Sequence, residues 1–268
     1  MKEWDLDGFK LDFIDSFCLR GEDPAIAQNY EGRDIKTVPA AVDVLMREVH
    51  DALIAIKPDV LIEFRQKYVG TAIAQYGNMF RVGDCPGDLQ ANRIGICNLR
   101  LTSGPVAIHS DMIEWNVEES AAGAARAILS SLFGVIQYSV MLKDIPQEHI
   151  RVIEHWLDFS QKHRNALLKG EFYPHHPEAG YPIVESSDGN ERIIAVYQEG
   201  QVVDLCSLSE KSVYLINAAS AAQLVVDAPR DFKKVEIFDA EGNRAGVMKV
   251  KKGLSRINVP ESGYIILR

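Results

Sequence analysis

The sequence lacks the features that mark several large classes of protein. Its four cysteines have no C-x-x-C spacing and are too few for a disulfide scaffold, so we expect reduced thiols in a cytoplasmic protein. Basic residues do not cluster and the formal net charge is −9, which argues against nucleic acid as a partner. No apolar run is long enough to span a bilayer and Met1–Asp5 do not resemble a signal peptide, so no membrane association is predicted.

Motifs for nucleotide and hydrolase chemistry are also missing. There is no G-x-G-x-x-G, no P-loop and no G-x-S-x-G, so dinucleotide binding, phosphoryl transfer and the α/β-hydrolase fold lose support. His109 and Asp111 lie only two residues apart, and two ligands need further partners to hold a metal ion. His175 and His176 are distant in sequence. We therefore predict neither a metal nor an organic cofactor.

What is present, up to about Leu167, is a repeated strand–helix pattern. The period of the apolar residues and the turn signals place strands and helices in alternation. The expected strands cover residues 9–14, 60–64, 79–82, 106–108 and 135–140, and the expected helices cover 42–56, 118–133 and 146–167, with Glu118 and Glu119 in the first turn of the second. Strands joined by helical crossovers form a parallel sheet.

Polar residues gather where these strands end, which is where parallel sheets place their chemistry. They are Asp12, Asp15, Glu63, Arg65, Asp84, His109 and Asp111. This pattern fits the catalytic face of a (β/α)8 barrel, but only about five strands are present. We therefore expect a partial barrel over residues 1–170, with three further strands upstream.

Beyond Leu167 the pattern changes to short β-rich runs. Residues 172–177 are expected to form a linker or strap, and strands are expected from Ile183 onward, over 192–197, 202–205, 212–216, 223–226, 234–238 and 263–267. Turn signals at 187–190 and 240–243 separate them. The predicted second domain, residues 171–268, is a small antiparallel β-sandwich.

The most informative segment is Gly8–Phe13. Its alternation is that of a strand with Lys10 and Asp12 on one face and apolar side chains on the other. A lysine beside Asp12 favours the ionised carboxylate, which is the form a nucleophile needs. An ordinary ion pair at a strand end is the competing interpretation, and the position at the end of a barrel-like strand favours function.

A second acidic segment, Arg81–Asp88, follows the third strand. One carboxylate here and one at Asp12 would supply the two groups that glycoside hydrolysis needs, and a separation of about 5 Å would favour retention of configuration. Asp84 directly follows the strand and is the better candidate for the acid/base. Asp88 precedes what looks like a helix start, so a capping role is favoured for it, although the choice between the two stays open.

Other polar residues are candidates for binding a sugar. Glu63 and Arg65 end the second strand with Tyr68 close behind, and they could bind hydroxyl groups or be solvated strand-end charges.

Further candidates for binding a sugar lie at and after the fourth expected strand. His109 and Asp111 are expected to line a polar pocket, with Trp115 either a platform for a sugar ring or part of the core.

These residues resemble the retaining α-galactosidase clan, the melibiase-like families. Lys10-Leu11-Asp12 resembles the Lys-x-Asp of the clan's fourth barrel strand, which implies that Asp12 is the nucleophile. Arg81 and Asp84 match the clan's substrate-binding arginine and acid/base aspartate. The resemblance implies about strands four to eight of the barrel and a small β domain after it. The Cys-Ser-Gly-Gly-Gly motif of one branch is replaced by residues 63–68, and Gly83-Asp84 also suits the α-glucosidase/α-xylosidase family.

The resulting prediction is a retaining glycoside hydrolase most like an α-galactosidase, acting on an oligosaccharide or glycoside. The catalytic residues are Asp12 and Asp84; Lys10, Arg81, Glu63, Arg65, His109 and Asp111 bind substrate. The alternatives are an α-glucosidase-like or α-xylosidase-like hydrolase, and an inactive fragment serving as a carbohydrate-binding or assembly subunit. Open sheet edges would favour a homo-oligomer or association with a missing amino-terminal half.

Overall fold

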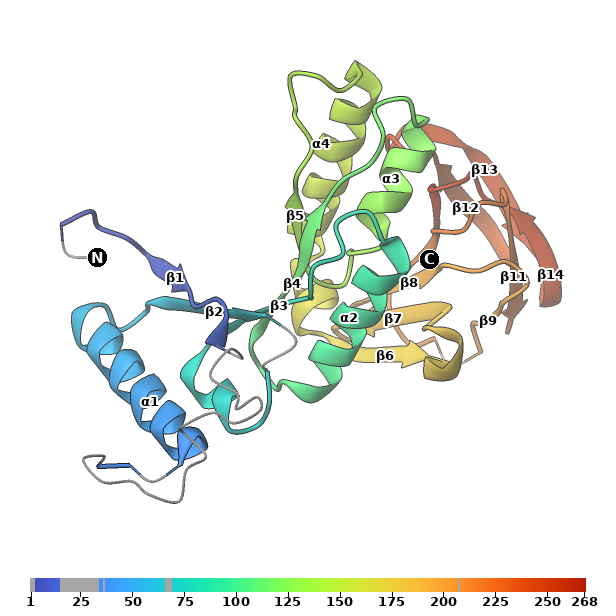
Figure 1. Ribbon diagram of the computed structural model, residues 1–268. Helices are drawn as coiled ribbons and strands as arrows, with labels where there is room; N and C mark the ends of the chain where they lie inside the picture. The colour runs from blue at the N-terminus through green and yellow to red at the C-terminus, as the bar shows by residue number, and fades with distance from the viewer. Residues whose placement is uncertain (1–2, 15–33, 36, 66–68, 207) are drawn as a thin grey trace. The chain divides into compact units, whose positions relative to one another are not determined.

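The computed structural model of the chain describes residues 3–14, 34–35, 37–65, 69–206 and 208–268, and has a mixed α/β fold (Figure 1). Asp15, Cys18 and Tyr68, which figure in the sequence predictions, lie outside the described residues. A five-stranded parallel sheet has the order β1-β2-β3-β4-β5. Its strands are β1 (Gly8–Lys10), β2 (Leu61–Arg65), β3 (Met79–Arg81), β4 (Ala107–Ile113) and β5 (Val135–Tyr138).

The predicted strands of this sheet are present, and β1 and β4 differ most from the predicted lengths. β1 ends at Lys10, so Asp12 follows the strand instead of lying in it. The reason is local: the Phe13 N–H donates to Asp12 Oδ1, 2.9 Å away, and Phe13 has a φ of 56°, so the backbone turns away from the ladder. β4 runs on to Ile113, so His109 and Asp111 lie within the strand and not beyond its end.

The chain divides into two compact units, and the first comprises Met1–Gly83 and Asn98–His109. One face of its sheet is apolar, with Ile62, Phe64, Phe80 and Ile108 buried and the rings of Phe64 and Phe80 stacked 6.1 Å apart. The Asn78 side chain bonds the backbone of β2 at both Ile62 N and Val60 O, each at 2.9 Å. This amide fixes the start of β3 beside β2.

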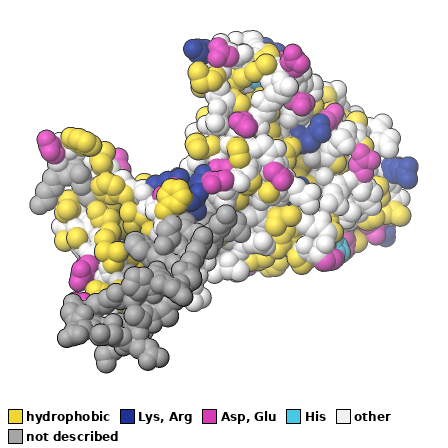
Figure 2. Space-filling view, viewed as in Figure 1, with side chains coloured by type: hydrophobic (Ala, Val, Ile, Leu, Met, Phe, Trp, Pro, Cys, Tyr) yellow, Lys and Arg dark blue, Asp and Glu magenta, His cyan; other side chains and the backbone are white. Residues whose placement is uncertain are grey.

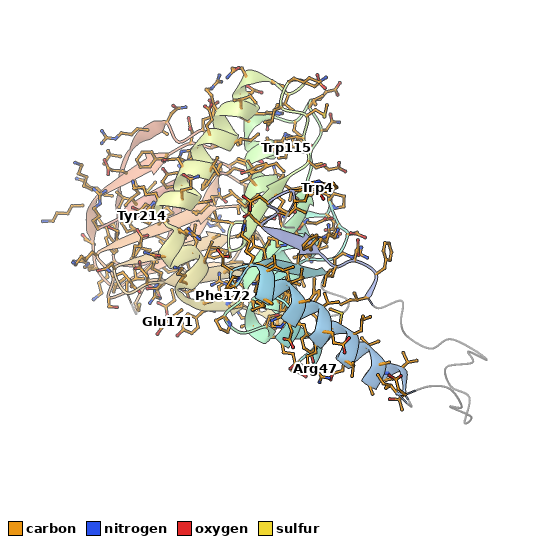
Figure 3. The ribbon with its side chains drawn as sticks, turned by 90° about the vertical axis from the view of Figure 1, so that its left-hand side faces the viewer. Trp4, Arg47, Trp115, Glu171, Phe172 and Tyr214 are labelled. Carbon is orange, nitrogen blue, oxygen red and sulfur yellow. The ribbon has the colours of Figure 1, made fainter. Side chains whose placement is uncertain are left out.

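Helix α1 (Val38–Ile56) of the first unit confirms the predicted helix. Thr37 caps it, accepting a hydrogen bond from Ala40 N, and Pro39 stands in its first turn, where its missing N–H costs no bond. Arg47 and Asp43 pair at i,i+4 on its surface (Figure 3). Figure 2 shows hydrophobic side chains over β1 and α1; large exposed ones include Leu45 and Ile56 of α1, and Trp4, which precedes β1.

The second unit, Asp84–Cys97 and Ser110–Arg268, holds the remaining helices. These are α3 (Ala121–Leu129), α4 (Gln147–Lys162) and a π-helical turn over Asn165–Lys169, while α2 (Leu89–Thr102) begins in this unit. Glu118 and Glu119 were expected in the first turn of α3, but they precede it. Ser120 is the cap, because its Oγ accepts from Gly123 N at 3.1 Å.

Two further sheets in this unit are largely antiparallel, with parallel pairing only for β8/β10 and β9/β11 among the described pairs. A seven-stranded sheet has the order β13-β12-β15-β10-β8-β7-β6, and a three-stranded sheet the order β14-β11-β9. The strands are β6 (Glu171–His175), β7 (Ile183–Ser187), β8 (Glu191–Val196), β9 (Val202–Asp204), β10 (Ser212–Asn217), β11 (Gln223–Ala228), β12 (Phe232–Phe238), β13 (Arg244–Val250), β14 (Gly253–Asn258) and β15 (Tyr264–Leu267). An apolar cluster that includes Leu205, Leu215, Val226, Val235 and Ile265 forms their core.

The segment expected as a strap is therefore strand β6, paired with β7 from Glu171↔Ser187 to His175↔Ile183. The turns predicted at 187–190 and 240–243 are confirmed, with Gly189 and Gly242 at φ 85° and 79°. A boundary near residue 170 remains a prediction.

Helix α4 packs its aromatic face on the seven-stranded sheet. The Trp156 indole donates to Ala240 O at 3.0 Å, and Phe159 meets Tyr214 of β10 edge-on at 5.7 Å between ring centroids (Figure 3). α3 is held by two links to the turn before β15: Ser262 Oγ donates to Ala122 O, and Arg126 pairs with Glu261. These contacts make α3, α4 and the β-sheets one packed unit.

Among the described residues, every helix is too short or too polar to cross a membrane.

A buried carboxylate in the β-sheet region gives a pH-dependent prediction. Burial alone would raise the pKa of Glu210, but hydrogen bonds from Ser187, Arg192 and the Ser209 N–H outweigh it, and the pKa is lowered. The carboxylate therefore stabilises the fold above the unfolded pKa of about 4.3, and this stabilisation is lost as the pH falls towards the native pKa. We expect Glu210→Gln to cost roughly 1.5–3 kcal/mol of unfolding free energy at pH 7.

Urea denaturation of the Glu210→Gln variant and the wild type at pH 7 and pH 3 measures this effect. The matched control is Glu178→Gln, whose side chain is 72% exposed. A cost that is equal at both pH values would contradict the prediction.

Candidate functional site

The face of the parallel sheet opposite its apolar core carries charged side chains. In register, Lys10 of β1 pairs with Glu63 of β2, and Arg65 of β2 pairs with Arg81 of β3, which pairs with His109 of β4. Paired residues of neighbouring parallel strands point to the same face, as do residues two apart in one strand. We call these five residues, with Asp12 just past β1, the polar face. All six belong to the first unit.

Asp12 is held by three groups on this face. Its Oδ1 lies 2.7 Å from Arg65 Nη2 and accepts from the Phe13 N–H at 2.9 Å, while Oδ2 lies 3.4 Å from Lys10 Nζ. The Asp12 side chain keeps 30% of its surface exposed. Two cations and an N–H around one carboxylate stabilise its ionised form and fix its direction. The arrangement suits a nucleophile that is ionised, oriented and accessible.

Glu63 is the second carboxylate of the polar face. Its Oε1 lies 4.0 Å from Arg81 Nε, and its Oε2 lies 3.6 Å from His109 Nε2. Arg81 and His109 are only 4% and 1% exposed, so the Glu63–Arg81 ion pair is largely desolvated, and His109 adds a charge to it only when protonated. Charged groups at such distances interact strongly in a medium of low dielectric constant and form a rigid polar surface.

The turn that carries Asp84 belongs to the second unit and has its own supports. The Cys85 N–H donates to Asp111 Oδ2 at 2.5 Å, and Asn92 Nδ2 donates to Cys85 O at 2.8 Å. Asn92 Oδ1 in turn accepts from Asp111 N at 2.9 Å. Asp84 itself is exposed, directly before this fixed turn. Such an exposed carboxyl on a fixed backbone can exchange a proton with a ligand.

Asp88 has a structural role, as the sequence favoured. Its Oδ1 accepts from Ala91 N at 2.9 Å and so caps α2. Further along α2, Arg93 donates from Nε and Nη2 to Gly180 O at 3.1 and 3.0 Å, and its guanidinium lies 4.5 Å from the centre of the Tyr197 ring. Burial lowers the pKa of Arg93. These contacts anchor the helix that follows the Asp84 turn.

The structure thus groups Lys10, Asp12, Glu63, Arg65, Arg81 and His109, while Asp111 supports the Asp84 turn. Two features were missed from the sequence. Arg65 was considered for hydroxyl binding, yet its guanidinium contacts Asp12; this contact follows from the register Lys10↔Glu63, which the sequence alone does not give. Asn92, which joins Cys85 to Asp111, carries no sequence signal either.

Within the described part of the chain, no three His, Cys, Asp or Glu side chains are grouped so that they could hold a metal ion.

Solved structures match this fold, while no protein-family model and no curated protein matches the sequence. One is the GH36 α-galactosidase AgaA of Geobacillus stearothermophilus, a doubly substituted variant in complex with stachyose, at 13% identity and a TM-score of 0.51. Another is the galactosidase domain of the α-galactosidase–sucrose kinase AgaSK, at 11% identity and a TM-score of 0.45. The chain matches over 90% of its own length but spans only 33% of AgaA. The likeness to AgaA shows a fold similar to part of a GH36 α-galactosidase.

Proposed function

We propose that this chain is the carboxyl-terminal part of a retaining glycoside hydrolase that acts on terminal α-linked sugars, most like an α-galactosidase. Its parallel sheet would be about strands four to eight of a (β/α)8 barrel, and the largely antiparallel sheets would form the domain that follows. The observation that carries the proposal is Asp12, set between Arg65 and Lys10 at the end of β1, in a fold similar to part of AgaA.

The proposed reaction is a double displacement that uses the carboxylate of Asp12 and the carboxyl group of Asp84. Asp12 Oδ would attack the anomeric carbon as the bond to the leaving oxygen breaks, giving a covalent glycosyl ester. Asp84, protonated at the start, would give its proton to that oxygen and then take one from the incoming water. Water would displace Asp12 from the sugar with a second inversion, so the product keeps the α configuration.

The rest of the polar face would hold the sugar. Lys10 and Arg65 keep Asp12 ionised and directed, and each has further N–H groups that can donate to a hydroxyl. Glu63 can accept from hydroxyl groups, while Arg81 and His109 limit its movement. The proposed roles of Arg81 and His109 include direct contact with the substrate, and Asp111 would act by holding the Asp84 turn.

Covalent labelling tests the proposal. The protein is incubated with a cyclitol aziridine of α-galacto configuration, which traps retaining nucleophiles, and its peptides are mapped by mass spectrometry. We expect one label, on the peptide that contains Asp12, and protection by excess methyl α-galactoside. An unlabelled protein, or a label at another residue, would overturn the proposal. An α-gluco or α-xylo probe that labels Asp12 faster would reassign the sugar to the α-glucosidase/α-xylosidase alternative.

A non-catalytic role as a carbohydrate-binding or assembly subunit is the second candidate. The hydrophobic side chains exposed over β1 and α1 favour it, because such surfaces promote association. Gel filtration combined with a nitrophenyl α-galactoside assay separates the two: an inactive protein that binds sugar, as a monomer or in an assembly, supports the second candidate.

A further inference from the structure

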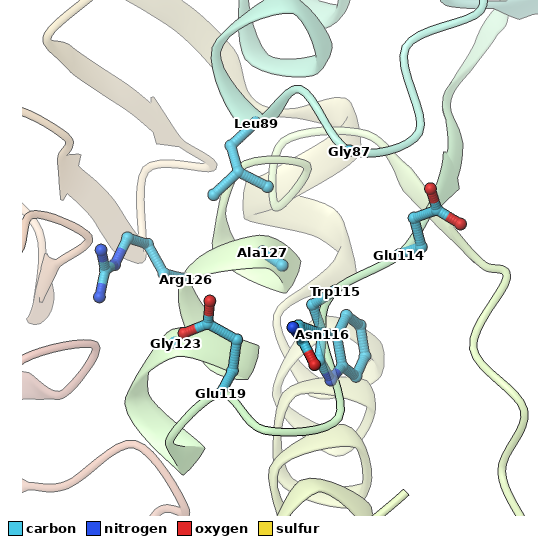
Figure 4. Close-up of a pocket in the computed structure, with 9 residues that line it drawn as sticks. All are labelled: Gly87, Leu89, Glu114, Trp115, Asn116, Glu119, Gly123, Arg126 and Ala127. Atoms are coloured by element: carbon cyan, nitrogen blue, oxygen red, sulfur yellow. The ribbon is translucent and has the colours of Figure 1, made fainter. Parts of the chain in front are cut away.

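The second unit contains a pocket that the proposed chemistry does not use. It has a volume of about 460 Å³, within the range of small-molecule sites. Figure 4 shows that three segments form it: the turn before α2, the segment after β4 and the first turns of α3. We call it the Trp115 pocket; its principal lining residues are Leu89, Glu114, Trp115, Asn116, Glu119 and Arg126.

Trp115 is fixed in this pocket by a buried histidine. Its indole N–H donates to His149 Nδ1 at 3.2 Å, and His149 Nε2 lies 2.9 Å from Glu119 O. Because Nδ1 must accept, the proton of the neutral ring is on Nε2, which then donates to the carbonyl. Tyr138 packs edge-on against the indole, with 6.4 Å between ring centroids. The indole is half-buried and has one orientation before any ligand arrives.

The opposite wall is also rigid. Glu119 folds over Gly123, where an added Cβ would lie 2.4 Å from Glu119 Oε2, so a larger residue there would displace this carboxylate. Arg126 pairs with Glu261, and Ser262 Oγ donates to Ala122 O at 2.6 Å, so the first turns of α3 cannot shift. In Figure 4 Leu89 and Glu119 extend into the opening from two different segments. The pocket is therefore preorganised on both sides, which lowers the cost of binding.

The lining groups define the ligand. The indole and Leu89 offer apolar surface, whereas the Glu114 and Glu119 carboxylates and the Asn116 amide offer hydrogen-bonding groups. An anion would meet two carboxylates, and the charge of the Arg126 guanidinium is taken up by Glu261, so Glu114 and Glu119 are the groups that select for a ligand with hydrogen-bond donors. A neutral pyranose ring, with an apolar face of C–H groups and a rim of hydroxyl donors, matches both kinds of surface.

We propose that the Trp115 pocket binds one neutral hexose unit of a glycan, with the ring stacked on the indole and hydroxyl groups donating to Glu119 and Glu114. The inference rests on the proposed function only for the choice of sugar, because binding here requires no hydrolysis. The pocket would add affinity for longer oligosaccharides.

Binding is measured on the Asp12→Asn protein, so that turnover is removed, with stachyose and methyl α-galactoside as probes in calorimetry and saturation-transfer NMR. We expect Trp115→Ala and Glu119→Gln, each added to this background, to weaken stachyose binding by about tenfold. Glu118→Gln is the matched control, because Glu118 neighbours the pocket without lining it, and its binding should not change.

Three results would overturn the inference: stachyose that does not bind, stachyose binding that is the same in Trp115→Ala and Glu119→Gln, or methylguanidinium that binds more tightly than the sugar. Thermal unfolding shows whether Trp115→Ala is folded. If it is not, stachyose binding by Glu119→Gln alone tests the inference. The cyclitol label on Asp12 is scored separately in the Trp115→Ala protein with Asp12 intact, so that failure of the pocket and failure of the nucleophile are told apart.

Discussion

Replacing Asp12 with alanine should reduce the hydrolysis of nitrophenyl α-galactoside by a factor on the order of 10⁴ or more, because the group that forms the covalent intermediate is removed. Steady-state kinetics measure the loss. Sodium azide should restore part of the rate, since a small anion can enter the space of the lost carboxylate. The product should be the β-galactosyl azide, because azide then attacks the substrate directly in a single inversion.

The control for this prediction keeps a carboxylate at position 12 but moves its oxygen atoms. Asp12→Glu retains a carboxylate beside Arg65 and Lys10, so its fold should be intact, yet the displaced oxygen should leave most activity lost. Wild-type activity in Asp12→Ala, or an azide product of α configuration, would remove Asp12 from the role of nucleophile.

The second large effect is expected at Asp84. Asp84→Ala should lower the rate by about 10²–10⁴ for substrates with poor leaving groups, which need a proton, and far less for dinitrophenyl galactosides, which do not. Azide should now give the α-galactosyl product, because it intercepts the intermediate on Asp12 after the first inversion. The contrast in azide stereochemistry distinguishes the two aspartates without reference to absolute rates.

Asp88→Ala is the matched control for Asp84. It removes the cap on α2, so it should cost about 1 kcal/mol of stability while the dependence on the leaving group stays that of the wild type. If Asp88→Ala instead shows the leaving-group dependence and Asp84→Ala does not, the acid/base role passes to Asp88.

The parts of the fold that could be predicted from sequence are those with a strong apolar period. β2 alternates buried residues with more exposed ones, and α1 repeats apolar residues along one side, so their positions were found. Strands β6, β7, β13 and β14 were missed, and all of them except β7 lie at the edges of their sheets. An edge strand has one neighbouring strand and one edge open to solvent. In β13 the burial alternates, but apolar Ala245 and Val247 occupy exposed positions, so the residue types do not reveal the strand.

For the site, residue types could be predicted but not their partners. Lys10 beside Asp12 follows from spacing alone, because both are in one short segment. Arg65 on Asp12, and Asn92 between Cys85 and Asp111, depend on register and on the packing of a helix against a strand. Such tertiary contacts leave no periodic signal in a single sequence.

The hydrogen bonds that fix α3 can form only late in the synthesis of the chain. Ala122 and Arg126 are bonded to Ser262 and Glu261, which follow them by 140 and 135 residues. During synthesis α3 therefore leaves the ribosome long before its partners exist, and at 5–20 residues per second the delay is roughly 7–28 s. Until then the Ser120 cap holds its first turn. A ribosome that stalls ahead of β15 would release a chain with α3 unanchored, which quality-control proteases could recognise.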